Sequence, residues 1–268
     1  MLIICNKNLN FRFFSIKKHI IKKTCLLFLS FCVIIPAGDF MIISGFQKLT
    51  LLDFPGHTAC TLFTHGCNMR CPFCHNSALV SGQAPGIHTQ EEILSFLKKR
   101  QGLLDGVAIT GGEPLLHKDI AEFIKKIKAL GFSVKLDTNG SVPERLEELI
   151  SGGLVDYIAM DIKNCKEKYS LSAGTEIDIR DIERSVELIK NSSLPHEFRT
   201  TVTRELHTEE DIISVAKWLG KEEKYFLQQF KDSGDILTDG QSAHGDDTLR
   251  EFALSASEFV KLCETRGI

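Results

Sequence analysis

The sequence predicts an α/β fold built as a partial (β/α)6 barrel, a shortened relative of the TIM barrel. Short apolar and β-branched runs alternate with amphipathic helix-like runs after Met41, which is the pattern of parallel α/β proteins. Six strand–helix pairs fit into residues 41–268, whereas a complete barrel has eight pairs and typically needs ~250 residues. An open doubly wound sheet would fit the same pattern, and in both folds ligands lie at the carboxyl ends of the strands.

The expected strands are short and mostly apolar, as strands covered on both faces are. In chain order they span Thr58–Thr64, Gly106–Thr110, Ser133–Asp137, Asp156–Asp161, Glu197–Val202 and Tyr225–Gln229.

The helices expected between these strands have recognisable starts and ends. Their signals, in chain order, are a capping box at Thr89 and Glu92, an apolar stripe from Ile120 to Leu130 before Gly131, Pro143 as a first-turn residue, a stripe at Ile182, Val186 and Ile189, and a cap at Thr208 with an end at Gly220. A last helix is expected from about Leu249 to Cys263.

The composition excludes several classes of protein. With 43% hydrophobic and 25% charged residues the chain is globular, not disordered. A formal net charge of -3 provides no basic field that would favour nucleic acid as a partner. Nine cysteines in 268 residues are too few for a disulfide-rich secreted scaffold.

Residues 1–40 differ from the remainder. They hold six Lys or Arg residues against the single acid Asp39, and an apolar run from Cys25 to Ile35 follows the basic group. This leader resembles a secretory signal peptide, whereas a membrane anchor would need ~20 apolar residues. The other interpretations are an extension of a cytoplasmic protein and translation that starts at Met41. We expect the last, with residues 41–268 as the folded domain.

The first expected strand is followed by three cysteines, Cys67, Cys71 and Cys74, in a C-x3-C-x2-C spacing. Three thiolates on one loop can ligate a single metal centre. A zinc site could add His75 as a fourth ligand, although adjacent ligands are awkward to aim at one ion. A [4Fe–4S] cluster usually takes four cysteines, so three would leave one iron open to a substrate or cofactor.

At this motif the sequence resembles the radical S-adenosylmethionine (SAM) enzymes, which share the spacing and an aromatic residue at the position of Phe73. Thr110-Gly111-Gly112-Glu113-Pro114, at the second strand end, resembles their SAM-binding motif, in which glycines let the main chain approach a ligand. The resemblance implies a partial barrel of the radical SAM type, a [4Fe–4S] cluster on the three cysteines and Phe73 against adenine. It also implies SAM contacts from four further residues, namely Gly111, Gly112, Glu113 and Pro114.

The third and fourth strand ends, Asp137-Thr138-Asn139-Gly140 and Asp161-Ile162-Lys163, are similar to those of glycyl-radical activating enzymes. Ordinary turn chemistry would also explain them. The resemblance implies a monovalent-cation site at Asp137, Thr138 and Asp161 beside the SAM carboxylate. It implies SAM contacts from Asp137, Asn139, Asp161, Lys163 and Arg199, and places Lys163 close to that carboxylate.

The segment Gly45–Gly56, together with Cys74-His75-Asn76, resembles the activating proteins of anaerobic ribonucleoside-triphosphate reductases. This resemblance implies reductive cleavage of SAM to a 5′-deoxyadenosyl radical and a glycyl radical on a partner, anaerobic (class III) ribonucleotide reductase, with flavodoxin or ferredoxin as electron donor. An enzyme acting on a small molecule or another peptide remains an alternative, as does a zinc-binding interaction module without catalysis.

The compartment, the isolated cysteines and a loop near the carboxyl end can also be interpreted from the sequence. An oxygen-sensitive cluster needs a reducing compartment for assembly, so we expect a cytoplasmic protein with no membrane partner. The isolated Cys60, Cys165 and Cys263 are expected to be core or surface thiols. Residues 231–245, rich in Gly, Ser and Asp, are expected to form a mobile loop that helps to receive the partner, with a solvated His244.

Overall fold

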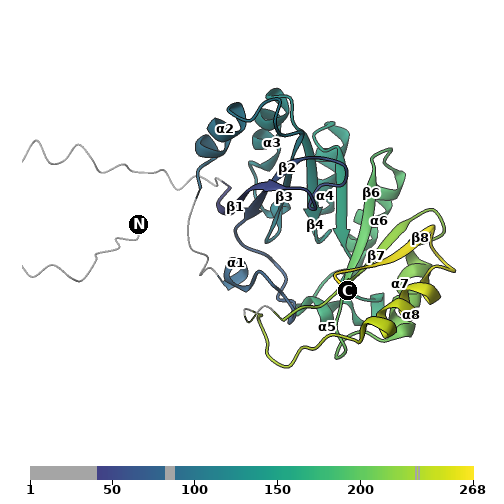
Figure 1. Ribbon diagram of the computed structural model, residues 1–268. Helices are drawn as coiled ribbons and strands as arrows, with labels where there is room; N and C mark the ends of the chain where they lie inside the picture. Colours follow the sequence, from purple (N-terminus) through teal and green to yellow (C-terminus); the bar gives the residue numbers. More distant parts are fainter. Residues whose placement is uncertain (1–40, 82–87, 233, 235) are drawn as a thin grey trace, which may run out of the picture. The chain divides into compact units, whose positions relative to one another are not determined.

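The computed structural model of the protein describes residues 41–81, 88–232, 234 and 236–268 (Figure 1). The leader, residues 1–40, lies outside the described residues, so its interpretation stays a prediction. Among the helices in the described part of the chain, none combines the length and apolar character needed to cross a membrane.

The described residues contain one sheet of eight strands whose spatial order follows the chain, β1 to β8. β1 pairs antiparallel with β2, and every later neighbour pairs parallel. The strands are β1 Ile43–Thr50, β2 Ala59–Thr64, β3 Gly106–Gly111, β4 Ser133–Thr138, β5 Tyr157–Asp161, β6 His196–Val202, β7 Lys224–Gln229 and β8 Leu262–Arg266. Parallel strands that succeed one another in chain order, with helices between them, form the expected partial barrel.

The helices lie between these strands in the chain, as Figure 1 shows. The α-helices are α1 Ser77–Ser81, α2 Gln90–Lys98, α3 Ile120–Ala129, α4 Pro143–Ser151, α5 Tyr169–Ala173, α6 Ile179–Asn191, α7 Glu209–Leu219 and α8 Asp246–Ala256, and two 3-10 turns span η1 Pro114–Leu116 and η2 Lys166–Lys168. The capping box of Thr89 and Glu92 is formed, and Pro143 occupies the first turn of α4, as the sequence predicts.

Two strands were not expected from the sequence. β1 lies at one edge of the sheet, and its polar residues Gln47 and Lys48 are exposed, so it lacks the apolar pattern of a buried parallel strand. At the other edge, the expected last helix is wrong beyond Ala256, because residues Leu262–Arg266 form β8. β8 is held by pairing with β7 and by an Arg266–Glu197 ion pair, contacts that local sequence does not reveal.

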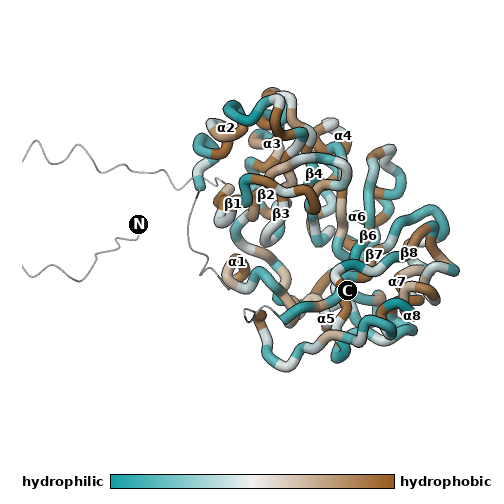
Figure 2. The backbone as a smooth tube through the Cα atoms, in the orientation of Figure 1, coloured by the Kyte–Doolittle hydropathy of each residue, from teal (hydrophilic) through white to brown (hydrophobic). Residues whose placement is uncertain are grey.

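The two faces of the sheet differ, which corrects the expectation of strands that are apolar on both faces. Buried apolar residues such as Leu136, Ile158 and Phe198 join the core with the helices. Figure 2 shows helices that alternate between hydrophobic and hydrophilic residues, as amphipathic helices do. The alternate positions of β4 to β6 carry charged or polar groups on the opposite face, namely Lys135, Asp137, Tyr157, Asp161, Glu197 and Arg199. We call this the inner face.

Candidate functional site

The three cysteines lie on the loop that leaves the carboxyl end of β2, and this cluster loop, residues 66–76, is braced at several points. The backbone N–H of Arg70 donates to Ala173 O at 2.8 Å, and that of Glu113 donates to Gly66 O at 2.8 Å. The Arg70 guanidinium donates to the carbonyl of Cys67 at 2.6 Å. The loop is therefore held by α5, by the end of β3 and by its own side chains.

The thiols of the cluster loop are free of disulfide bonds. The Cys67 sulfur accepts N–H groups from Met69 at 3.4 Å and from the Asn139 amide at 3.7 Å, and such donors stabilise negative charge on sulfur. Burial raises the pKa of Cys67, and that of Cys71 to about 11, while the Lys163 ammonium acts to lower both. An iron–sulfur centre would supply the positive charge that ionises them, so three thiols near a lysine fit a cluster.

The paired glycines after β3 are required by the close approach of the cluster loop. Gly111 has φ +113°, and a Cβ there would lie 2.4 Å from the backbone N of Thr64. A Cβ on Gly112 would lie 1.8 Å from Gly66 O. The glycines therefore allow the close approach of β2 and the cluster loop, and because both glycines also line the pocket described below, their predicted contact with SAM stays a proposal.

Two predicted SAM contacts, Glu113 and Pro114, do not line the pocket described below. Pro114 is buried in the first turn of η1. The fully buried Glu113 carboxylate accepts hydrogen bonds from Leu115 N at 3.0 Å, Thr138 Oγ1 at 2.8 Å and Asn139 N at 2.7 Å. Burial raises its pKa to about 7, against these hydrogen bonds. Glu113 thus joins the β3 and β4 strand ends, and the predicted contacts of Glu113 and Pro114 with SAM stay proposals.

The side chain of Asn139 also forms hydrogen bonds with other residues of the chain. Its amide Nδ2 donates to Cys67 Sγ and to Asn68 Oδ1, the latter at 3.0 Å, and its Oδ1 accepts from Ser141 N at 2.9 Å. The turn after β4 therefore buttresses the cluster loop. Asn139 also lines the pocket described below, and its predicted contact with SAM stays a proposal.

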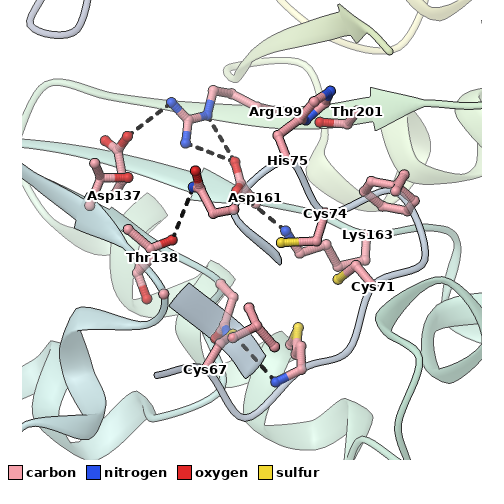
Figure 3. Close-up of a pocket in the computed structure, with 18 of the residues that line it drawn as sticks. Cys67, Cys71, Cys74, His75, Asp137, Thr138, Asp161, Lys163, Arg199 and Thr201 are labelled. Carbon is pink, nitrogen blue, oxygen red and sulfur yellow. Dashed lines mark hydrogen bonds and ion pairs between the residues drawn. The ribbon is translucent and has the colours of Figure 1, made fainter. Parts of the chain in front are cut away.

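Charged side chains of the inner face gather beside the thiols. Asp137 and Asp161, from β4 and β5, both contact the guanidinium of Arg199 from β6 (Figure 3). Lys163 lies 3.3 Å from the second oxygen of Asp161. Burial raises the pKa of Asp161, but Arg199 and Lys163 overcome this effect and lower it to about 2. Asp161 is therefore ionised at neutral pH.

One pocket brings most of the predicted residues together. Twelve of the fourteen predicted site residues line it, namely Cys67, Cys71, Phe73, Cys74, Gly111, Gly112, Asp137, Thr138, Asn139, Asp161, Lys163 and Arg199. It lies at the carboxyl ends of the strands, where the fold class predicts ligands. The pocket residues Met69, Thr201 and Gln228 were not predicted from the sequence. Alternation along β6 and β7 from Arg199 could have identified Thr201 and Gln228.

A buried histidine outside the pocket wall, His207, contacts the pocket residues Phe73 and Lys163. It was not predicted from the sequence. Its Nδ1 accepts the backbone N–H of Thr203 at 3.1 Å, so Nε2 carries the proton and donates to the carbonyl of Lys163 at 2.8 Å. Its ring lies edge-on to Phe73 with centroids 6.1 Å apart. Burial lowers the pKa of His207, which keeps the ring neutral. His207 thus links the cluster loop to the Lys163 segment.

The zinc alternative receives no support from the position of His75. This histidine is exposed, its Nε2 is hydrogen bonded to Lys231 O at 2.6 Å, and its ring packs near Phe230. The isolated Cys60, Cys165 and Cys263 are buried, as expected of core thiols.

The segment between β7 and α8, residues 230–245, contacts the cluster loop. Thr238 N donates to Pro72 O at 3.2 Å, in addition to the contact between His75 and Lys231. The expected solvated His244 is wrong, because the ring is half-buried against Phe252 and its Nε2 is hydrogen bonded to His207 O at 3.1 Å. Residues 233 and 235 of the predicted partner loop lie outside the described residues.

A sequence model of the radical SAM superfamily matches residues 61–219, which include the cluster loop, the glycine pair and the charged strand ends. The chain belongs to the radical SAM superfamily. Its cofactors are therefore a [4Fe–4S] cluster and SAM, and the chain is a radical SAM enzyme, not a zinc-binding module without catalysis.

Two individual proteins are similar to this radical SAM enzyme over different lengths. A Methanocaldococcus jannaschii protein named as a candidate glycyl-radical enzyme activating enzyme is 35% identical over 229 residues, 82% of this chain and 93% of that protein. A Pyrococcus abyssi protein named as a probable GTP 3′,8-cyclase is 26% identical over 162 residues, 59% of this chain and 51% of that protein.

Solved structures share the fold. A radical SAM methyltransferase from Sphaerobacter thermophilus superposes with a TM-score of 0.64 at 12% identity, over 82% of this chain and 69% of that one. SuiB from Streptococcus suis, bound to SAM, gives 0.58 at 14% identity, over 75% of this chain and 48% of that one. At such identities the likeness concerns architecture, and it confirms the predicted partial barrel of the radical SAM type.

Proposed function

We propose that this radical SAM enzyme generates a glycyl radical on a partner protein, and that the partner is an anaerobic ribonucleotide reductase. The observation that carries the proposal is the 35% identity to a candidate glycyl-radical enzyme activating enzyme, because it extends over 93% of that protein. The relative named as a cyclase matches over only 51% of its length. When bound, the cluster and SAM supply the radical chemistry, with the electron coming from a flavodoxin or ferredoxin.

The chain's own residues would hold and orient the cofactors. Cys67, Cys71 and Cys74 would ligate the cluster, and the backbone at Gly111 and Gly112 would face SAM. Lys163 and Arg199, both in the pocket wall, would bind the SAM carboxylate through charge-assisted hydrogen bonds. Phe73, a buried side chain of the pocket wall, would pack on adenine and exclude water.

The segment between β7 and α8 would contribute to partner recognition. It is tied to the cluster loop through Pro72 and His75, so a glycine loop that reaches the pocket would pass beside it. Asp239 is exposed on this segment, and we expect Asp239→Lys to weaken radical formation on the partner while leaving partner-independent SAM cleavage intact. Equal radical yield in this variant and in the exposed control Asp247→Lys, on α8, would argue against the segment's role.

The decisive experiment is anaerobic incubation of the reconstituted enzyme with SAM, a reductant and the candidate reductase. Electron paramagnetic resonance should show a glycyl radical, and methionine and 5′-deoxyadenosine should accumulate. SAM cleavage without a glycyl signal, repeated with several glycyl-radical enzymes, would favour the alternative of a small-molecule or peptide substrate.

A further inference from the structure

The two carboxylates at which a monovalent cation is predicted are already bridged by a cationic side chain. Arg199 donates from Nη1 to Asp137 Oδ2 at 3.3 Å and from Nε to Asp161 Oδ1 at 2.9 Å (Figure 3). A sodium or potassium ion would need the same oxygens as ligands. The guanidinium therefore takes the place between the carboxylates that such an ion would occupy.

A second fixed cation contacts Asp137 from within the sheet. The Lys135 side chain is 2% exposed, and its ammonium is ion-paired with Asp137 Oδ1. It also lies over the ring of Tyr157, 5.9 Å from the centroid. Breaking a buried ion pair leaves an uncompensated charge, so Lys135 stays bound to Asp137. Both oxygens of Asp137 are thus engaged by cations of the chain.

The third predicted ligand of the cation is engaged as well. Thr138 Oγ1 donates to Glu113 Oε1 at 2.8 Å and accepts the N–H of Gly140 at 3.1 Å. These contacts hold the turn after β4 in place, and they direct the hydroxyl toward Glu113. The set Asp137, Thr138 and Asp161 therefore does not fit an added monovalent ion in this structure.

The formal charges of the side chains in this part of the inner face sum to a positive value without a metal ion. Three cations, Lys135, Lys163 and Arg199, face two carboxylates, Asp137 and Asp161, which leaves one formal positive charge. Two further carboxylates lie near this cluster. Glu197 is itself paired with Arg266 through two hydrogen bonds of 2.7 and 2.8 Å, and Glu113 accepts hydrogen bonds from Leu115 N, Thr138 Oγ1 and Asn139 N. Within the five-residue cluster, the excess of one charge matches one substrate carboxylate.

We propose that this five-residue cluster binds the carboxylate of SAM with fixed cations of the chain and that SAM binding needs no monovalent metal ion. Arg199 and Lys163 line the pocket and present the charge, while Lys135 neutralises Asp137 from beneath. The proposal concerns the binding of SAM, and it stands or falls independently of which partner receives the radical.

The test is the affinity of the anaerobically reconstituted enzyme for SAM in three salts of equal ionic strength. Equilibrium dialysis with labelled SAM is carried out in sodium, potassium and tetramethylammonium chloride, the last being too large for a carboxylate-lined ion site. We expect dissociation constants that agree within about twofold. Binding that is about tenfold weaker, or more, in tetramethylammonium than in sodium or potassium would overturn the proposal.

A second measurement uses no SAM. An ion that binds the folded chain raises its melting temperature, so the cluster-free protein is melted in the same three salts. Equal melting temperatures support the proposal. A rise of several degrees with sodium or potassium alone, which Asp137→Asn removes, would show an ion at the carboxylates and contradict it.

Lys135→Met tests the assigned charge directly, since Lys135 is not part of the pocket wall. With one fixed charge removed, we expect SAM binding to become dependent on sodium or potassium by about tenfold. Lys128→Met is the matched control, because Lys128 pairs with Asp156 before the amino end of β5, and its binding should stay independent of the salt. If Lys135→Met bound SAM with wild-type affinity in all three salts, the role of Lys135 would be refuted. If that variant does not fold, Arg199→Lys is used instead. This variant keeps the charge, so its affinity for SAM should remain independent of the salt.

Discussion

Replacing Glu113 by alanine should destabilise the protein because it removes the acceptor that joins two strand ends. The side chain is fully buried and accepts hydrogen bonds from Leu115 N, Thr138 Oγ1 and Asn139 N. A buried donor that loses its acceptor costs about 1–3 kcal/mol, so three donors cost about 6 kcal/mol at mid-range.

Part of this loss is recovered in the variant. The pKa of Glu113 is raised from 4.5 to about 7, chiefly by burial, so at pH 8 the fold with the ionised carboxylate is about 3 kcal/mol less stable than it would be with the carboxyl protonated. Alanine has no carboxyl to ionise, so this amount is subtracted from the loss of the acceptor. We therefore expect Glu113→Ala to lower the free energy of unfolding at pH 8 by about 3 kcal/mol, the difference between these terms.

The measurement is urea unfolding of the cluster-free protein under nitrogen, followed by circular dichroism. Glu251→Ala, on the exposed surface of α8, is the matched control and should change the free energy of unfolding by less than about 0.5 kcal/mol. If Glu113→Ala were as stable as this control, the three donors would have found other acceptors, and the positioning role of Glu113 would be refuted.

Three further outcomes follow from the same structure. Because the folded-state pKa of Glu113 is raised, its contribution to stability is present below pH 4.5 and is lost as the pH rises through about 7. Over this range, the free energy of unfolding of the wild type, measured by urea titration, should fall by about 3 kcal/mol relative to that of Glu113→Gln. Parallel pH profiles of the two proteins would contradict the raised pKa. Cys71→Ala should abolish the visible absorbance of the reconstituted cluster and SAM cleavage, whereas Cys263→Ala, at a core thiol away from the pocket, should retain both. His207→Phe removes the donor to Lys163 O and should raise the KM for SAM about fivefold, the equivalent of one hydrogen bond, with kcat less affected. The amide of His207→Gln can replace that donor, so this variant should recover most of the affinity. Equal KM values in the two variants would argue against the role of the hydrogen bond.

Local sequence was sufficient to predict strands β2 to β7 and most of the longer helices between them, because their signals are local. The capping box at Thr89, the proline at residue 143 and the apolar stripe of α3 each lie within a few residues of the boundary that they mark. β1 and β8 could not be predicted in this way. Edge strands are stabilised by pairing and by distant contacts such as Arg266 with Glu197, and these depend on residues far away in the chain.

The candidate site was predictable in its location for a similar reason. Strand ends of a parallel sheet meet at one edge, so polar residues that follow successive strands, such as Asp137, Asp161 and Lys163, were expected to converge, and they line one pocket. The role of each residue was less predictable. Glu113 has a carboxylate that could contact a ligand, yet its oxygens face backbone N–H groups that only the folded loop places there.

The sequence by itself determined the chemistry of this protein: three thiols on one loop, a glycine pair after the next strand, and charged residues at the following strand ends. The tertiary structure decided how these groups are used. The glycines make room for the backbone of the cluster loop, Glu113 and His207 hold strand ends in position, and Arg199 with Lys135 neutralises the two carboxylates assigned to a cation. The physical reason is that burial leaves a charged or polar group stable only with a partner, and that partner is chosen by the register of neighbouring strands.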